Sequence, residues 1–262
     1  MSTQRPTALV TGASSGIGAV FAREFASRGH DLVIAARRTD RLKELAAEIT
    51  ATHGVDVRVI AADLAETGAA QKLAKAIGKT PIDVVVNNAG WGHIGPFADE
   101  DIDGIAAEIN VNIVSLTQLT RLFVAPMIER GRGTVINIAS TAAYQPVPNM
   151  SVYAATKAYV LSFTEALWGE LQGTGVTALA VSPGGTATEF FDVAGGRAMG
   201  SALMTPAQVV ATAMATLDAR SPAPSVVVGG RNRFMAVAGR FVPRRQLIAV
   251  AKGLMKSDNV GK

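Results

Sequence analysis

The chain has 262 residues, of which 48% are hydrophobic and 18% charged, so it can bury a sizeable core and fits one large α/β domain better than several small ones. It has no cysteine, which excludes disulfides, zinc–thiolate sites and thiol nucleophiles, and its three scattered histidines argue against a metal or histidine-based catalytic centre. The net charge of +4 is uneven, because residues 231–262 carry +7 and residues 1–230 carry −3.

The N-terminal stretch MSTQRPTALVTG enters an apolar strand pattern at once, without a basic segment followed by an apolar one. We therefore expect no secretion signal and a cytoplasmic protein. Apolar runs such as TALAVSPGG are shorter than the about 20 residues that span a bilayer, so we also expect no transmembrane helix.

Apolar, β-rich runs alternate with longer helical patterns along the chain. The first five segments, in βαβαβ order, are TALVTG, GAVFAREFASRG, DLVIAAR, RLKELAAEITATHG and VRVIAADL. The rhythm continues through IDVVVNNAG, a helix near 101–130, GTVINIAS, a helix near 151–173, VTALAVSPGG, a helix near 206–219 and APSVVVGG. Strands such as DVVVN are apolar without alternation, as expected where helices cover both sheet faces. We predict one domain over residues 1–230, with a Rossmann-like, doubly wound, seven-stranded parallel sheet and helices on both faces.

A glycine-rich turn joins the first predicted strand to the first helix. The stretch TALVTGASSGIGAVF contains Gly12, Gly16 and Gly18. Gly12 allows a tight turn, Gly16 lets the backbone approach a pyrophosphate, and Gly18 lets the helix pack close to the sheet. The helix N-terminus adds amide donors and the positive end of a dipole. This context predicts a dinucleotide site, the alternative being a tight turn without a ligand.

The second strand ends in IAARRTDR, where a site for NAD usually carries an acidic residue about 20 residues after the glycines. Ala36, Arg37 and Arg38 stand there instead. Guanidinium groups can pair with a 2′-phosphate, and Arg38 can also stack on adenine. The pattern favours NADP, the alternative being a solvated arginine pair that opens a helix.

A tyrosine and a lysine lie four residues apart in SVYAATKAYV. One helical turn separates Tyr153 from Lys157, so both project from the same face. A nearby cation favours the phenolate of a tyrosine, whose ordinary pKa is about 10. Spacing alone also suits an ordinary helix. Tyr159 points away from that face and is not expected to act as the acid.

Seven motifs together resemble, in order and spacing, those of the short-chain dehydrogenase/reductase family over residues 7–230. They are TGASSGIG (11–18), DL (63–64), NNAG (87–90), NVN (110–112), INIAS (136–140), YAATK (153–157) and PGGTAT (183–188). In the family they supply, in turn, the cofactor loop, an adenine contact, support for the central sheet, a catalytic asparagine, a serine, the tyrosine–lysine pair and the nicotinamide loop.

The resemblance implies four catalytic residues. Tyr153 would protonate a carbonyl oxygen in reduction or accept the alcohol proton in the reverse direction, and Ser140 would orient that oxygen. Lys157 would hold the nicotinamide ribose and lower the pKa of Tyr153. Asn112, chosen over Asn110 from the hydrophobic pattern that follows it, would anchor a water linking Lys157 to solvent. A strand cap at Ser140 and a polar helix contact at Asn112 are the alternatives.

The resemblance also implies cofactor contacts, with Pro183 facing the nicotinamide and Thr188 bonding its carboxamide, unless Thr188 is only a turn residue. The expected cofactor-binding residues are Gly12, Ser14, Ser15, Gly16, Ile17, Gly18, Arg37, Arg38, Asp63, Leu64, Asn88, Ala89, Gly90, Tyr153, Lys157, Pro183, Gly184, Thr186 and Thr188.

The substrate side is less defined. Residues 184–204 have five glycines and no clear period, which suits a mobile flap or a plain surface loop. Phe190 and Phe191 there suggest an apolar substrate, and Tyr144 can line the same cavity. Trp91 and His93, after the fourth strand, suit substrate contact and loop packing equally.

Residues 231–262 alternate basic and apolar side chains on either side of Pro243, which predicts a basic amphipathic extension. Such helices can lie weakly on an anionic membrane or cover a substrate entrance, whereas packing on the body or on a sister subunit is the alternative. Basic charge is confined to this tail, and no helix-turn-helix or zinc spacing is present, so we expect no nucleic-acid partner.

The resemblance implies an oxidoreductase that interconverts a ketone or aldehyde and an alcohol, as a homodimer or homotetramer. The arginine pair adds a preference for NADP(H), and Phe190 and Phe191 add a small, mostly apolar substrate. Two alternatives are a peripheral-membrane reductase of lipid-linked carbonyls and a non-catalytic, cofactor-binding regulator. Ser140, Tyr153, Lys157 and Asn112 argue against the regulator, because binding alone does not need a proton-transfer set.

Overall fold

The computed structural model describes residues 5–195, 203–239 and 241–257. Its strands form one parallel sheet in the order β3-β2-β1-β4-β5-β6-β7. They are β1 (Thr7–Thr11), β2 (Asp31–Ala36), β3 (Val57–Ala61), β4 (Val84–Asn87), β5 (Gly133–Ile138), β6 (Val176–Ser182) and β7 (Ser225–Val227). The predicted seven-stranded, doubly wound parallel sheet is confirmed.

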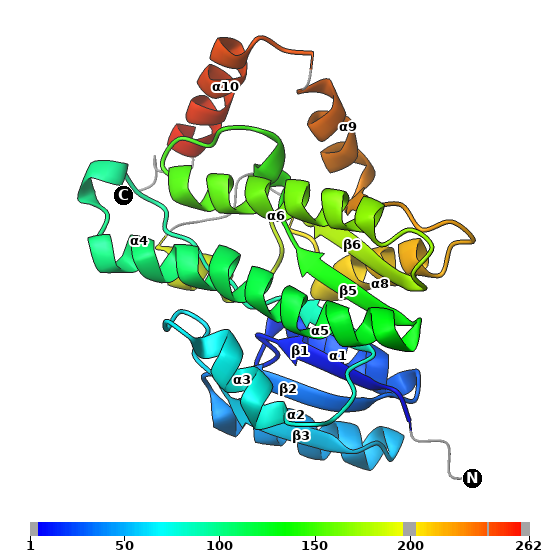
Figure 1. Cartoon of the computed structure of the whole chain (residues 1–262). Coiled ribbons are helices and arrows are strands. Elements are labelled where there is room, and N and C mark those ends of the chain that lie inside the picture. Colours follow the sequence, from blue (N-terminus) through cyan, green and yellow to red (C-terminus); the bar gives the residue numbers. More distant parts are fainter. Residues whose placement is uncertain (1–4, 196–202, 240, 258–262) are drawn as a thin grey trace.

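Helices connect the strands and cover both faces of the sheet (Figure 1). The α-helices are α1 (Gly16–Ser27), α2 (Thr39–His53), α3 (Ala69–Ile77), α4 (Ile102–Ile109), α5 (Leu116–Arg130), α6 (Ser151–Glu170), α7 (Phe190–Ala194), α8 (Pro206–Leu217), α9 (Gly230–Ala238) and α10 (Arg244–Ser257). Two short 3-10 turns, η1 (Phe97–Asp99) and η3 (Thr141–Tyr144), and a π-helical segment, η2 (Asn110–Ser115), complete the described elements.

The core divides between the two faces of the sheet, as the alternation of strand side chains requires. Val10 of β1 packs with Phe21 of α1 and Leu42 of α2, whereas its neighbour Leu9 packs on the opposite face with Leu119 of α5. All five side chains are essentially inaccessible to solvent. Burying each stabilises the fold by about 1.5–3 kcal/mol relative to exposure, so these apolar strands fix the position of everything at their ends.

The order of the strands reverses between β1 and β4, which creates a crevice at the carboxyl ends of the sheet. Buried amides and hydroxyls hold this region together. Asn87 Nδ2 donates to Thr120 Oγ1 at 3.0 Å and to Asn137 Oδ1 at 2.9 Å, and Asn137 Nδ2 donates to Thr164 Oγ1 at 2.9 Å. The network joins β4, β5, α5 and α6, so the strands that carry the predicted site are fixed to the helices behind them.

The elements α4, η2 and α5 form one helical run of 29 residues, Ile102–Arg130, with a mean hydropathy of 1.3 over its most apolar window. By length and composition this run could cross a membrane, although the sequence led us to expect no such helix. A core helix of a globular protein has the same composition, and here α5 packs on β4 and β5.

The predicted extension contains a helix on each side of Pro243, as expected. Helices α9 and α10 lie beyond α6 at the top of Figure 1, the far side of the molecule from β3. Ala236, Leu247 and Ala251 are buried, so one side of each helix packs on the protein. Arg240 and residues 258–262 of the extension, and 196–202 of the predicted flap, lie outside the described residues.

Candidate active site

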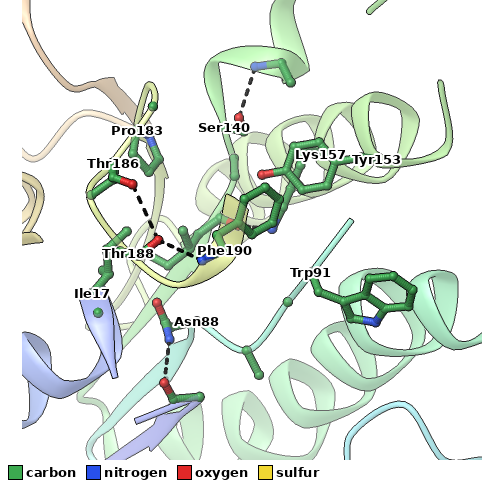
Figure 2. Close-up of a pocket in the computed structure, with 18 of the residues that line it drawn as sticks. Ile17, Asn88, Trp91, Ser140, Tyr153, Lys157, Pro183, Thr186, Thr188 and Phe190 are labelled. Atoms are coloured by element: carbon green, nitrogen blue, oxygen red, sulfur yellow. Dashed lines mark hydrogen bonds between the residues drawn. The ribbon is translucent and has the colours of Figure 1, made fainter. Parts of the chain in front are cut away.

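The carboxyl ends of the central strands open into a cavity of about 880 Å³. Its wall takes residues from the turn after β1, the ends of β2, β4 and β5, the segment after β6, and α6 and α9; Figure 2 shows the principal side chains. Ligand pockets are typically about 300–1,000 Å³, so this one has room for a large ligand or for two ligands together.

The glycine turn after β1 forms the floor of one end of the cavity. Gly12 has a φ of +65°, and a Cβ there would lie 2.8 Å from Ala89 Cα. A Cβ on Gly18 would lie 2.5 Å from Gly12 O, so helix α1 can start directly under the turn only with glycine at both positions. Asn88 Nδ2 donates to Thr11 O at 3.0 Å and to Gly12 O at 3.2 Å, which fixes the turn against β4. Ser15, Gly16 and Ile17 at the start of α1 line the cavity, so this helix N-terminus can serve as an anion cradle.

A cluster of charged side chains occupies the outer end of this cradle. Arg38 donates from Nη1 to Glu189 Oε2 at 2.7 Å and from Nη2 to Ser15 Oγ at 2.9 Å and Ser14 Oγ at 3.1 Å. Arg41 binds the other carboxylate oxygen, Oε1, of Glu189. These hydrogen bonds, those from Arg41 and Arg38 above all, hold the pKa of Glu189 down at about 2. The end of β2 is thus a strongly cationic site for an anion.

The predicted tyrosine, serine and lysine meet at the inner end of the cavity (Figure 2). Ser140 follows β5, and its Oγ accepts the backbone N–H of Ala142 at 3.1 Å. Tyr153 and Lys157 come from the first turns of α6, and Lys157 Nζ lies 5.7 Å from the centre of the tyrosine ring. Nζ donates to Ile138 O at 2.8 Å, which ties the lysine to the end of β5.

Burial dominates the protonation of this group. It raises the pKa of Tyr153 to about 12, against a hydrogen bond with Ser140 that lowers it. Burial also lowers the pKa of Lys157 to about 8, against the attraction of Glu108. Lys157, whose Nζ donates to Ile138 O, is not among the groups that shift the pKa of Tyr153, so the expected lowering by Lys157 stays a prediction. At neutral pH the phenol keeps its proton and can donate it.

Asn112 lies behind this group, in the π-helical segment η2, and is completely buried. Its Nδ2 donates to Trp91 O at 2.8 Å and to Thr156 Oγ1 at 3.0 Å, and its Oδ1 accepts from Trp91 N at 3.2 Å. A Cβ on Gly90 would lie 2.7 Å from Asn112 Oδ1 and 3.3 Å from Lys157 Nζ. Through these hydrogen bonds Asn112 holds the segment after β4 in place beside Lys157, although Asn112 does not line the cavity itself.

The segment after β6 forms one side of the cavity, and hydrogen bonds between residues close in the sequence hold its shape. Thr186 Oγ1 donates to Gly184 O at 3.0 Å, and the backbone N–H of Phe190 donates to Thr188 Oγ1 at 3.3 Å. The ring of Phe190 then lies 5.2 Å from that of Tyr153, centre to centre. Residues 184–189 of the predicted flap therefore form a structured turn that leads into α7, and the first aromatic residue of α7, Phe190, covers the tyrosine (Figure 2).

A sequence model described as short chain dehydrogenase matches residues 6–195, most of the chain. The chain belongs to the short chain dehydrogenase family.

The chain is also similar to dehydrogenases and reductases that carry different names. It is 37% identical over 187 residues to the very-long-chain 3-oxoacyl-CoA reductase of Anas platyrhynchos, which covers 70% of this chain and 60% of that protein. The chain thus spans about 60% of the length of the curated relatives that it matches. A short-chain dehydrogenase from Sphingobium yanoikuyae in complex with NADPH has a TM-score of 0.79 and 33% identity, over 98% of this chain and 97% of that one. For a bulky-bulky ketone specific alcohol dehydrogenase from Comamonas testosteroni the values are 0.78 and 31%, over 91% and 94%.

The structure brings the site residues that we predicted for this short chain dehydrogenase to one cavity, with two exceptions. Gly18 lies under the glycine turn and Asn112 lies behind Trp91, and neither lines the wall. Trp91 does line it, but its indole packs on the core and lies apart from Tyr153 in Figure 2. His93 does not line it. The residues lining the cavity also include the aromatic side chains considered from sequence, Tyr144, Phe190 and Phe191.

Several residues at or near the cavity of this dehydrogenase were not predicted from the sequence. Arg41 stands one helical turn after Arg38, so its spacing could have revealed a second arginine on the same face. Glu189 and the α9 residues Asn232 and Met235 reach the cavity only through the tertiary fold. Across residues 5–195, 203–239 and 241–257, no group of three or more histidine, aspartate or glutamate side chains could hold a metal ion.

A further buried acid of the dehydrogenase, Glu108, lies on α4 one turn before Asn112. Its side chain is fully inaccessible; Oε2 accepts the backbone N–H of His93 at 3.2 Å, and Oε1 has no hydrogen-bond partner within the described structure. Burial raises the pKa of Glu108 to about 7, against the hydrogen bond from His93, while Glu100 raises it further and Lys157 lowers it. Above pH 7 the folded protein therefore keeps a charged carboxylate out of contact with water, which lowers its stability.

Replacing Glu108 with glutamine should stabilise the protein at pH 8. Because the folded pKa lies above the ordinary 4.5, the folded state binds more protons than the unfolded state between pH 4.5 and 7, and stability falls as the pH rises through that window. The gain should reach up to about 3 kcal/mol at pH 8 and vanish below pH 4.5. Urea unfolding of both proteins at pH 8 and pH 4 measures it, and an equal difference at both pH values would contradict the assignment.

Proposed function

We propose that this chain is an NADP(H)-dependent carbonyl reductase acting on a bulky, mostly apolar ketone or aldehyde. The observation that carries the proposal is the placement of Tyr153 with Ser140 and Lys157 at the inner end of a cavity whose outer end is cationic. A phenol with a pKa of about 12 keeps a proton to donate at neutral pH, as carbonyl reduction requires.

The residues present fit a nicotinamide dinucleotide. The glycine turn leaves no room for a Cβ on Gly12 or Gly18, and the α1 N-terminus behind it suits a pyrophosphate. Lys157, Thr188 and Pro183 would hold the nicotinamide half, and the bound cofactor would supply the hydride. Tyr153 would donate the proton to the carbonyl oxygen while Ser140 orients that oxygen by a hydrogen bond.

The preference for NADP is supported by the arginines after β2. Arg37, Arg38 and Arg41 follow the strand where a site for NAD usually carries an acid, and Arg37 and Arg38 line the cavity. Forked guanidinium donors match the oxygens of a 2′-phosphate. The related enzyme from Sphingobium yanoikuyae, whose structure is a complex with NADPH, is consistent with this preference.

The size and chemistry of the substrate follow from the cavity wall. The cavity wall includes six aromatic and methionine side chains: Tyr144, Met150, Phe190, Phe191, Met204 and Met235. Methionine fills irregular space and adapts to large apolar groups. An apolar ketone, including a 3-oxoacyl group on a carrier, suits this wall, in line with the names of the similar proteins.

The test is NADPH oxidation over a panel of bulky ketones, aldehydes and 3-oxoacyl thioesters, with NADH in parallel. We expect turnover with apolar ketones and a preference for NADPH. Absence of turnover with every carbonyl, alongside tight NADPH binding, would favour the non-catalytic regulator. Equal kcat/KM with NADH would overturn the preference for NADP while leaving the reductase intact.

A second candidate function, reduction of lipid-linked carbonyls at a membrane surface, is favoured by exposed side chains on α9, on α10 and between the two helices. Phe234 is 70% exposed and Phe241 84% exposed. Arg233, Arg244 and Arg245 are also exposed. Exposed aromatics among basic side chains are typical of segments that lie on anionic bilayers. Met235 of α9 also lines the cavity, so a substrate could pass from such a surface to Tyr153.

Replacing both Phe234 and Phe241 with serine should release the protein from anionic membranes. Co-sedimentation with phosphatidylcholine vesicles containing 30% phosphatidylserine is the measurement, and we expect the bound fraction to fall at least about tenfold because two aromatic side chains no longer enter the interface. Phe97→Ser is the matched control, since Phe97 is 60% exposed but lies in η1, outside the extension. Unchanged binding of the double variant would contradict a role of these two aromatics, and absence of binding by the wild type would contradict membrane association and favour packing on a sister subunit.

A further inference from the structure

The carboxylate of Glu189 bridges two arginines at the cationic end of the cavity. One oxygen accepts from Arg38 at 2.7 Å and the other accepts from Arg41. Arg38 simultaneously binds the hydroxyls of Ser14 and Ser15 in the glycine turn. Three segments far apart in the sequence therefore converge on one anion: the turn after β1, the start of α2 and the segment after β6.

This arrangement has the donor chemistry of a phosphate site. Two guanidinium groups bind a planar carboxylate, and the hydroxyls of Ser14 and Ser15 hold one of these guanidinium groups in place. An arginine fork binds phosphate oxygens as well as carboxylate oxygens. The three charged side chains are 39–49% exposed, so the ion pairs are solvent-screened and exchangeable. Ser14, Ser15, Arg38 and Glu189 also line the cavity that would take the cofactor.

We infer that Glu189 is an internal competitor for the 2′-phosphate: its carboxylate holds Arg38 and Arg41 until a phosphate displaces it, and it thereby sets the affinity for NADP(H) against NAD(H). The inference rests on the proposed function, because it takes the arginines after β2 as the 2′-phosphate site. It adds a specificity-determining residue from a segment that sequence patterns connect only with the nicotinamide end.

The same contact links the two ends of the cavity. Thr188, immediately before Glu189, packs on the glycine turn, where a Cβ on Gly16 would lie 2.9 Å from Thr188 Cγ2. Phe190, immediately after it, packs on Tyr153. One short segment therefore contacts the glycine turn, the arginine pair and the proton donor.

The experiment compares wild type with Glu189→Gln by direct titration calorimetry. The ligands are NADPH, NADH, adenosine 2′,5′-bisphosphate and adenosine 5′-monophosphate. We expect Glu189→Gln to lower the Kd for the two 2′-phosphorylated ligands about fivefold, as the loss of two exposed ion pairs suggests, and to change the other two by less than about twofold. Asp218→Asn is the matched control, because Asp218 makes a bidentate pair with Arg28 at 2.9 Å, and neither residue lines the cavity.

A triple variant separates competition from simple charge repulsion. In an Arg38→Gln, Arg41→Gln background the competing pairs are gone, so Glu189→Gln should bring no further gain; a persistent gain would overturn the inference. Weaker binding of NADPH by Glu189→Gln would also overturn it, because Glu189 would then close over the bound cofactor. If wild type binds NADPH and NADH alike, the proposed NADP preference fails, yet a 2′-phosphate preference that emerges in Glu189→Gln still supports the competitor. No preference in either protein contradicts both.

Discussion

Replacing Tyr153 with phenylalanine should lower kcat for carbonyl reduction about 10³-fold while the Kd for NADPH changes less than about twofold. The phenol is the proton donor placed at the inner end of the cavity, beside Ser140, and burial keeps it protonated with a pKa of about 12. Phenylalanine keeps the ring and its contact with Phe190, so the cavity retains its shape and loses only the proton.

Tyr159→Phe provides the matched control on the same helix. Tyr159 is 37% exposed, and its hydroxyl pairs with Thr117 Oγ1 at 3.0 Å, away from the cavity. Its removal should leave kcat within about twofold, because a partly exposed hydrogen bond of this kind affects only stability, by about 1 kcal/mol. Equal activity of wild type and the Tyr153 variant would refute the assignment of the acid, whereas loss of activity in both variants would indicate a structural defect of α6.

Replacing Lys157 with methionine should lower kcat/KM about 10²- to 10³-fold, as the loss of one positioned charge commonly does. Methionine has a similar length, so α6 should still pack, but the contact from Nζ to Ile138 O and the positive charge beside Tyr153 both disappear. We expect the Kd for NADPH to rise as well, because the resemblance implies that the ammonium holds the nicotinamide ribose. Steady-state kinetics and direct titration together separate the two effects.

The pH profile supplies a second readout for Lys157. Burial brings its pKa down to about 8 from the ordinary 10.5, so the charge is present below pH 8 and is lost as the pH rises through that value. Wild-type kcat/KM should therefore fall above pH 8, and that limb should be absent from Lys157→Met. Lys72→Met is the control. Lys72 is an exposed residue of α3 that pairs with Glu66, so its loss should leave the pH profile of kcat/KM unchanged.

Much of this architecture is predictable from local patterns. The all-apolar strands around Leu9 and Val85 could belong only to a sheet covered on both faces, and the glycines at 12 and 18 predict a strand, turn and helix in tight contact. The Tyr153 and Lys157 spacing placed both side chains on one face of α6. These features depend on neighbours within a few residues, which the sequence displays directly.

The features that sequence reasoning missed depend on tertiary contacts. Glu189 pairs with Arg38 across 151 positions of the chain, and nothing near either residue indicates the other. From the sequence, Glu108 would be an ordinary exposed position of an amphipathic helix. It is buried because α4 packs against α6. The pKa values of Tyr153 and Lys157 likewise follow from how deeply α6 is enclosed, so their protonation could not be derived from spacing alone.

The π-helical segment η2 has a consequence for which changes of sequence this protein can accept. A π turn holds one residue more than an α-helical turn, and one residue corresponds to a rotation of about 100°. The segment therefore lets Asn112 face Thr156 while Leu119, farther along, faces the sheet. Loss of a single residue within Asn110–Ser115 would rotate one of these two out of place. Substitution of an outward residue such as Val114, which is 36% exposed, should therefore disturb the protein less than a change in the length of this helix.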